Sequence, residues 1–158
     1  MSKLNPKNPF YKYLSVEDKE HIRVVEYLQN KYPNIIFTHV PAEGRKSQFE
    51  RYKASLMGTR KGIADFIIFH PKSKLKKDGE GQLYNELHYY GLLIELKAPE
   101  HNRVVLKGKN TGKIVKAKGK LSPEQLQLLN RLSSLKYKAV CCFGFEEAIK
   151  VIDEYFKK

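Results

Sequence analysis

The sequence predicts an α/β fold in which a mixed β-sheet is flanked by helices. Two kinds of segment lead to this prediction. Short apolar runs rich in β-branched residues, such as 65–69 and 90–97, are typical of buried strands. Segments with apolar residues at helical spacing, such as 16–31 and 146–156, alternate with these runs. The predicted elements follow the order α-β-α-β-β-α-β-α along the chain.

The chain has 158 residues, of which 41% are hydrophobic and 30% are charged. This length fits one domain of roughly 100–200 residues, and we expect a single domain over residues 15–158. Residues 1–14, which combine prolines with aromatic residues, predict an N-terminal arm that packs on the domain or on a second copy.

The first predicted helix covers residues 16–31. Ser15 suits the N-cap position, and Val24 and Leu28 lie one turn apart on its apolar face. Pro33 ends the helix. The β-branched and aromatic run 34–40 then predicts a short buried strand.

A second, shorter helix is predicted between Ser47 and Gly58. Ser47 and Glu50 have the spacing of a capping box, and Gly58 suits the end of a helix. The two strands that follow, 65–69 and 90–97, are predicted to form the centre of the sheet. The Lys- and Gly-rich stretch between them predicts a long connecting loop.

The third helix, 122–135, has a full start signal. Ser122 lies at the N-cap, Pro123 at the first position and Gln125 at the third. The last two predicted elements are a strand and an amphipathic helix, 139–143 and 146–156.

The two cysteines and the hydropathy pattern predict a soluble protein of a reducing, cytoplasmic compartment. Cys141 and Cys142 are adjacent in an apolar run, where they are expected to be buried, reduced thiols. No apolar run approaches the roughly 20 residues of a membrane span, and the N-terminus lacks a signal-peptide core. We expect no membrane partner.

The net charge of +13, from 30 basic and 17 acidic residues, predicts a polyanionic partner, with nucleic acid first. A well-solvated basic surface is the alternative. Segment 101–120 holds seven basic residues and no acid, and its glycines predict a flexible loop or short hairpin along a phosphate backbone. The residues expected to contact nucleic acid are Arg45, Lys46, Lys53, Arg60, Lys61, Arg103, Lys107 and Lys109.

Three charged residues in the strand runs are candidate catalytic groups. Glu95 and Lys97 lie two apart in a predicted strand, so their side chains leave the same face of an otherwise apolar run. Asp65 begins the neighbouring strand, where its carboxylate could face Glu95. A strand-end salt bridge would explain the first pair equally, and a strand-start cap would explain Asp65.

Converging carboxylates suit Mg²⁺ or Mn²⁺, which bind hard oxygen ligands. The backbone carbonyl of Leu96 could add a ligand. A metal there would polarise a phosphate and lower the pKa of a bound water, while Lys97 would orient that water or stabilise the growing negative charge. This chemistry is the hydrolysis of a phosphodiester.

Two further polar residues lie on predicted apolar helix faces. Glu20 is in line with Val24 and Leu28, which suggests an additional metal or water ligand. A first-turn glutamate that favours the helix dipole is the alternative, and Glu17 is a second candidate one turn earlier. Gln125 lines up with leucines one and two turns on, so it either points inward or serves only as a cap.

Four segments in sequence order resemble the VRR-NUC family of PD-(D/E)XK nucleases. They are 39–46, 56–65, 94–97 and 121–125, and the match spans about residues 17–155. The resemblance implies a restriction-endonuclease-like core. It also implies catalytic roles for five residues, Asp65, Glu95, Lys97, Glu20 and Gln125, with Glu20 among the metal ligands.

This sequence departs from the family pattern at three positions. Ala64 stands where the family usually has proline, Arg23 where helix one often carries glutamine, and Ala42 where asparagine is common. The departure at Arg23 concerns the substrate contacts of helix one. None of the three removes a catalytic charge.

The resemblance implies a phage-type, Mg²⁺- or Mn²⁺-dependent DNA endonuclease. Stand-alone members are expected to be homodimers that act on branched DNA, similar to Holliday-junction resolvases. A nicking or flap nuclease of the same fold and a non-catalytic nucleic-acid-binding protein are the alternatives. A nucleotide cofactor is not expected, because no Walker-type loop is present.

Overall fold

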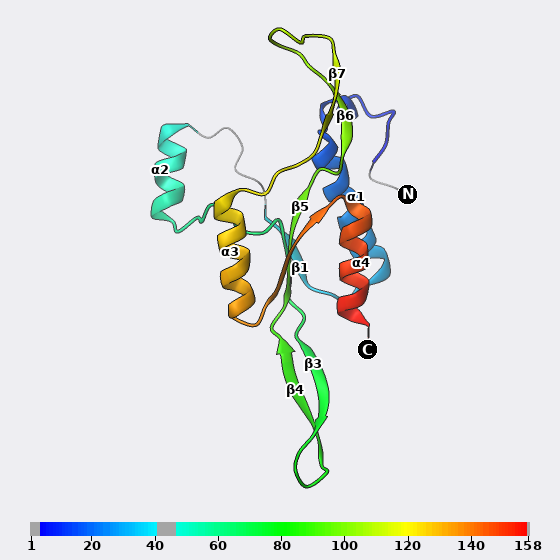
Figure 1. Ribbon diagram of the computed structural model, residues 1–158, viewed down its shortest axis with the longest axis vertical. Coiled ribbons are helices and arrows are strands. Elements are labelled where there is room, and N and C mark those ends of the chain that lie inside the picture. Colours follow the sequence, from blue (N-terminus) through cyan, green and yellow to red (C-terminus); the bar gives the residue numbers. More distant parts are fainter. Residues whose placement is uncertain (1–3, 41–46, 158) are drawn as a thin grey trace. The chain divides into compact units, whose positions relative to one another are not determined.

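The computed structural model describes residues 4–40 and 47–157 (Figure 1). The chain divides into two compact units. The first unit comprises Met1–Asn34, Leu96–Leu121 and Cys141–Lys158, and the second comprises Ile35–Glu95 and Ser122–Val140. Two of the boundaries, Glu95/Leu96 and Val140/Cys141, fall inside strands. The expectation of a single domain stays a prediction.

Four strands form one mixed sheet in the order β1-β2-β5-β8. They are β1 (Phe37–His39), β2 (Phe66–Ile68), β5 (Leu92–Lys97) and β8 (Lys138–Phe143). The pairs β1–β2 and β2–β5 are antiparallel. Strands β5 and β8 are parallel, because Gly91 O accepts from Lys138 N and, six residues on in both, Lys97 O accepts from Gly144 N. With helices beside it, this mixed sheet confirms the predicted α/β class.

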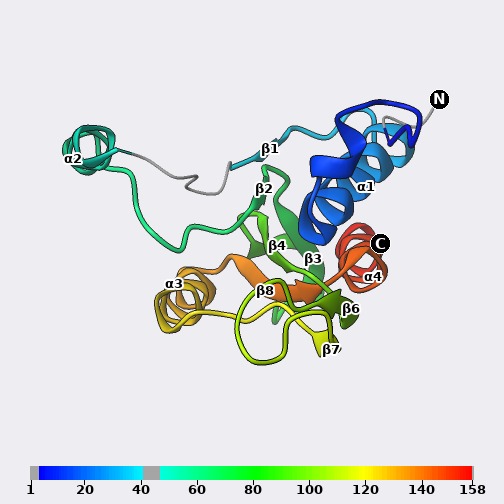
Figure 2. The ribbon, with the colours of Figure 1, turned by 90° about the horizontal axis from the view of Figure 1, so that it is seen from above.

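The second unit contains β1, β2, most of β5 and two helices, α2 (Gln48–Leu56) and α3 (Pro123–Ser134). Helix α3 lies along the strands, and Leu129 on its inner face is buried. Helix α2 stands clear of these strands in both views (Figures 1 and 2), and none of its residues is buried. The buried strand residues Phe66, Ile68, Leu92 and Ile94 form the core of this unit.

The predicted long loop between the two central strands was wrong. Residues of that stretch form a hairpin of β3 (Lys72–Lys77) and β4 (Leu83–Tyr89). Asp78 begins its turn, because its carboxylate accepts from the N–H groups of Glu80 and Gln82 at 3.0 and 2.8 Å. Five of the six β3 residues are exposed, so the strand lacks the apolar alternation by which strands are found in a sequence.

The first unit contains α1 (Val16–Lys31), α4 (Phe145–Phe156) and a hairpin of β6 (His101–Val104) and β7 (Ile114–Ala117). A 3₁₀ turn, Tyr11–Tyr13, precedes α1, and the Lys19 amine lies 4.3 Å from the Tyr11 ring centre. Helices α1 and α4 lie side by side in both views (Figures 1 and 2). Of the two predictions for segment 101–120, the hairpin is confirmed.

All three predicted capping serines begin helices. Ser15, Ser47 and Ser122 each accept from the backbone N–H three residues on, and the side chain there accepts from the serine N–H. Each pair forms a reciprocal capping box. Helix α1 has the predicted bounds, 16–31, and the other helices begin and end within a few residues of prediction.

Helices α1 and α4 are joined by a polar cluster around Asp153. Its carboxylate accepts hydrogen bonds from the hydroxyls of Tyr27 (2.6 Å) and Tyr32 (2.8 Å) and from the Lys31 amine (2.8 Å). Burial raises the pKa of Asp153, but these hydrogen bonds outweigh it, so that this pKa is lowered. Burial and the bond to Asp153 raise the pKa of Tyr32 to about 12.

Among the residues described, no helix has the length and apolar character needed to cross a membrane. Cys141 and Cys142 form no disulfide. Cys142 is buried, as the sequence predicts, whereas Cys141 is only half-buried, because the prediction rested on the apolar run and not on the packing of β8. Burial raises the pKa of the Cys142 thiol to about 12, which keeps the thiol protonated and unreactive.

Candidate active site

Three charged side chains are buried in the described part of the chain, and they are Asp65, Glu95 and Lys97. Their exposed fractions are 7%, 1% and 9%. Burial of a charge is unfavourable unless the charge is paired, hydrogen-bonded or bound to a metal. The three charged residues that the sequence marks as candidate catalytic groups are thus shielded from water.

Asp65 and Glu95 are neighbours across the β2–β5 pair of the second unit. The antiparallel register joins Ile68 with Leu92 and Phe66 with Ile94. Continued by one residue, it sets Asp65 opposite Glu95. Opposed residues of an antiparallel pair have β-carbons about 4.5–5.5 Å apart on one face of the sheet. The Asp65 carbonyl accepts from Val40 N–H at 2.7 Å, which fixes the backbone there.

Gln125 connects the start of α3 to Glu95. Its Oε1 accepts from the Ser122 N–H at 2.9 Å, as the third residue of a capping box does. Its Nε2 donates to Oε1 of Glu95. The two alternatives for Gln125, a cap or an inward-pointing side chain, therefore both hold, because one amide has a donor and an acceptor end.

A glycine brings the segment before Asp65 against the first turn of α3. Gly62 has φ +77°, and a β-carbon there would lie 3.1 Å from the Gln125 nitrogen. Other residues are disfavoured at this position both by the backbone conformation and by the close approach. The contact holds Arg60 and Lys61, the two preceding residues, beside α3.

In the first unit, the acid that accompanies Lys97 is Glu17. The Lys97 Nζ lies 3.8 Å from Glu17 Oε1, and Glu17 Oε2 accepts from the Ala98 N–H at 3.3 Å. Gly119 packs on the same place, since a β-carbon there would lie 2.7 Å from the Lys97 Cβ. Lys97 is therefore enclosed by α1 and by the end of the basic segment.

Glu20 belongs to α1, and its carboxylate lies at the beginning of α4. Its Oε2 accepts from the Phe145 N–H at 2.5 Å, and its Oε1 pairs with Arg23 at 3.1 Å. A carboxylate at a helix N-terminus is favoured by the helix dipole and by the unbonded N–H groups there. Its side chain is 12% exposed, in keeping with the stripe that Val24 and Leu28 form. The predicted catalytic and metal role of Glu20 stays a prediction.

Within residues 4–40 and 47–157, no three side chains of His, Cys, Asp or Glu gather closely enough to hold a metal ion. Two side chains that could bind an ion are the opposed carboxylates of Asp65 and Glu95. Mg²⁺ commonly takes one or two protein carboxylates and fills its other positions with water and phosphate oxygens. The donor set present thus fits a hard divalent cation.

The predicted nucleic-acid contacts belong to three places. Lys53 lies on α2, Arg60 and Lys61 follow that helix, and Arg103, Lys107 and Lys109 belong to the β6–β7 hairpin. All are exposed. Arg45 and Lys46 lie outside the described residues, as does Ala42.

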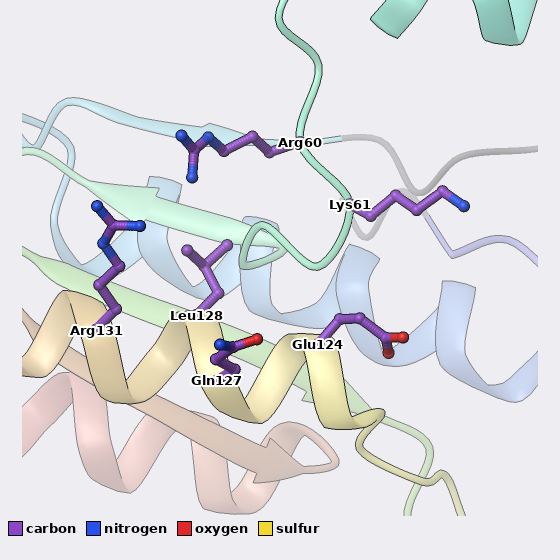
Figure 3. A pocket seen from close by; sticks show the side chains of 6 residues that line it. All are labelled: Arg60, Lys61, Glu124, Gln127, Leu128 and Arg131. Atoms are coloured by element: carbon purple, nitrogen blue, oxygen red, sulfur yellow. The ribbon is translucent and has the colours of Figure 1, made fainter.

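A cavity of about 270 Å³ in the second unit contains two of these residues (Figure 3). Its lining is Arg60, Lys61, Glu124, Gln127, Leu128 and Arg131. The sequence prediction missed the contribution of α3. The available signal was the spacing of its residues by three, four and seven positions, which places them on one helix face.

Comparison with solved structures identifies a protein named VRR_NUC domain protein. The TM-score is 0.56 and the identity 21%, over 90% of this chain and 89% of that chain. This chain has the VRR_NUC fold. The fold implied by the sequence resemblance is thereby confirmed. No protein-family model and no curated protein matches this chain.

Proposed function

We propose that the protein is a nuclease that uses Mg²⁺ or Mn²⁺ to hydrolyse phosphodiester bonds in DNA. The observation that carries this proposal is the burial of three charged side chains. Asp65 directly precedes β2, and Glu95 and Lys97 lie two residues apart on β5. The VRR_NUC fold and the net charge of +13 support it.

In this proposal Asp65, Glu95 and the Leu96 carbonyl hold the metal ion, with Glu20 as a further candidate ligand. When bound, such an ion polarises the scissile phosphate and lowers the pKa of a coordinated water. Gln125 fixes the orientation of the Glu95 carboxylate by donating to its Oε1. Lys97 donates hydrogen bonds to the attacking water or to the phosphate oxygens, where negative charge grows.

Glu17 has a positioning role in the same proposal. At 3.8 Å its carboxylate attracts the Lys97 ammonium and so helps to position it on the side of α1. Its other oxygen accepts a hydrogen bond from the Ala98 N–H, so that Glu17 is held by the residue that follows Lys97.

The finer proposal is a homodimer of phage type that acts on branched DNA in a reducing, cytoplasmic setting. The sequence resemblance supports the substrate, the dimer and the origin. The two cysteines, which form no disulfide, agree with the reducing setting. A flap or nicking nuclease is the alternative within this fold.

The test is cleavage of single-stranded, duplex, flap and four-way-junction DNA with and without Mg²⁺ or Mn²⁺. Asp65→Asn and Lys97→Met should each lower the cleavage rate by about 100-fold or more, because each removes a group that acts in the transition state. DNA binding in EDTA should be largely retained. Paired symmetric nicks in the junction would support the dimeric resolvase.

Two exposed residues provide matched controls, Glu80→Gln for the lost carboxylate and Lys150→Met for the lost amine. Both should cleave at the parental rate. Cleavage by Asp65→Asn or Lys97→Met at that rate would disprove the proposed site. A parent protein that binds all four substrates and cleaves none with either metal would instead be a non-catalytic binding protein, which the exposed basic segments favour as the second candidate.

A further inference from the structure

The cavity in the second unit has two walls (Figure 3). One wall is the segment with Arg60 and Lys61, which Gly62 holds against α3 through its close approach to Gln125. The other wall is a face of α3. Leu128 lies between the charged groups of the α3 wall and gives the cavity an apolar surface. The close approach thus fixes the backbone of one wall against the other, while the lining side chains are exposed except for the half-buried Leu128.

The charges in this cavity are unequal. Three lining residues are cations, and Glu124 is the one acid of the lining. The pKa of Glu124 is lowered, first by a hydrogen bond from its own backbone N–H, then by the Ser122 side chain, with Lys61 adding its positive charge. Glu124 is therefore an anion at neutral pH, and its charge is offset by Lys61.

Arg60 and Arg131 give a net positive charge to the end of the cavity away from Glu124. Figure 3 shows the guanidinium groups of Arg60 and Arg131 at one end of the cavity, and the Glu124 carboxylate and Lys61 at the other. Among the described residues, no carboxylate forms an ion pair with Arg60 or Arg131. An anion that enters at this end meets two guanidinium forks, with the amide of Gln127 on the same wall.

A phosphate group matches this arrangement. Guanidinium groups bind phosphate oxygens through two parallel N–H bonds, and their charge stays fixed at all physiological pH values. We propose that Arg60 and Arg131 bind a backbone phosphate of the nucleic acid.

The position of the cavity relates this phosphate to the candidate active site. Glu124 lines the cavity, while the next residue, Gln125, donates to Glu95. The same turn of α3 thus borders both places within the second unit. This inference rests on the proposed function, because the phosphate belongs to the substrate strand beside the bond that is cleaved.

DNA binding measured in EDTA by fluorescence anisotropy, over a series of salt concentrations, tests this site. Arg60→Ala and Arg131→Ala should each weaken binding and lower the slope of log affinity against log salt by about 1, as expected for one lost phosphate contact. Arg131→Lys should keep the slope and lose affinity, because it keeps the charge but not the fork. Lys74→Ala, an exposed cation of the same unit outside the cavity, should keep the parental slope.

Unchanged slopes in both alanine variants, with folding verified by circular dichroism, would overturn the proposal. So would an equal slope change in Lys74→Ala, because it would show a nonspecific charge effect. Since these measurements contain no metal, their result is independent of cleavage. A parent that fails to cleave while both arginine variants lose slope would refute the nuclease and leave the phosphate site in place.

Discussion

Gln125 shows how a single side chain can serve a helix and a site together. Its acceptor end completes the capping box of α3 and its donor end reaches Glu95, which is 1% exposed. A shorter side chain would lose both interactions. A glutamate could still cap the helix, but it would place a second carboxylate against Glu95.

The effects on stability separate the two interactions of Gln125. Ser122→Ala removes the cap alone and should lower the free energy of unfolding by about 1 kcal/mol. Gln125→Ala should cost about 1–3 kcal/mol more, because a buried carboxylate oxygen also loses its donor. Urea denaturation of the two variants measures the difference. Equal losses would show that the bond to Glu95 contributes nothing to stability.

Which candidate site residues could be assigned from the sequence depended on how local their geometry is. Glu95 and Lys97 share a strand, so their common face follows from the alternation of side chains. The choice between Glu17 and Glu20 could not be made, because both lie on the same helix side one turn apart. Only the packing of α1 in the first unit shows that Glu17 contacts Lys97 and Glu20 contacts the start of α4.

At the scale of elements, the junction of α1 and α4 depends on the charge of Asp153. The folded pKa of this acid is below its unfolded value, so its contribution is present above about pH 4 and is lost as the pH falls through the folded pKa. The Tyr32 hydroxyl has the opposite sign. Its pKa of about 12 implies a contribution that is present below about pH 10 and is lost as the pH rises toward 12.

Asp153→Asn should therefore destabilise the protein at pH 7, and this difference from the parent should shrink below about pH 4. Urea midpoints of both proteins at a series of pH values measure the effect. Glu80→Gln, an exposed acid elsewhere, should show no such trend. A difference that stays constant down to pH 2 would show that the carboxylate charge plays no part.

The two hairpins show where sequence patterns carry no information on pairing. Strands β3 and β4 pair with each other and not with the four-stranded sheet, and β3 is exposed at all but its first residue. Since neither face of β3 is buried, no apolar period marks it. The β6–β7 hairpin was predicted only as one of two alternatives, because its glycines suit a turn and a loop equally.

At the scale of the whole molecule, the positive charge is distributed over both units. The first unit carries it on the β6–β7 hairpin and the second at Arg60, Lys61 and Arg131. Proteins that neutralise phosphates release counterions, and the affinity then falls with salt in proportion to the number of contacts. If both regions engage DNA, the affinity of the protein for DNA should depend steeply on salt.

The triple variant Lys107→Ala, Lys109→Ala, Lys113→Ala tests the hairpin contribution. It should reduce the slope of log affinity against log salt by about 3, because each lysine that contacts a phosphate adds about 0.9. Anisotropy titrations in EDTA measure the slope, and the corresponding lysine-to-arginine triple variant should retain it. A parental slope in the alanine variant would exclude the hairpin from the DNA interface.

The fold of the whole chain was predictable because its central strands are short, apolar and in family order. The likeness to a VRR_NUC domain protein extends over 90% of this chain at only 21% identity. The division into two compact units was not predicted. It depends on which contacts form between segments far apart in the sequence, and local patterns of hydrophobicity do not record these contacts.

Gly119 joins the base of the β6–β7 hairpin to the end of strand β5. The hairpin leaves β5 just after Lys97, and its returning end passes back over the same lysine, where only a hydrogen atom fits. The Gly119 N–H also donates to the Ala98 carbonyl at 2.9 Å. The hairpin is thus clamped at both of its roots around Lys97, so that force applied at its tip by a bound strand would be borne by the backbone that carries this lysine.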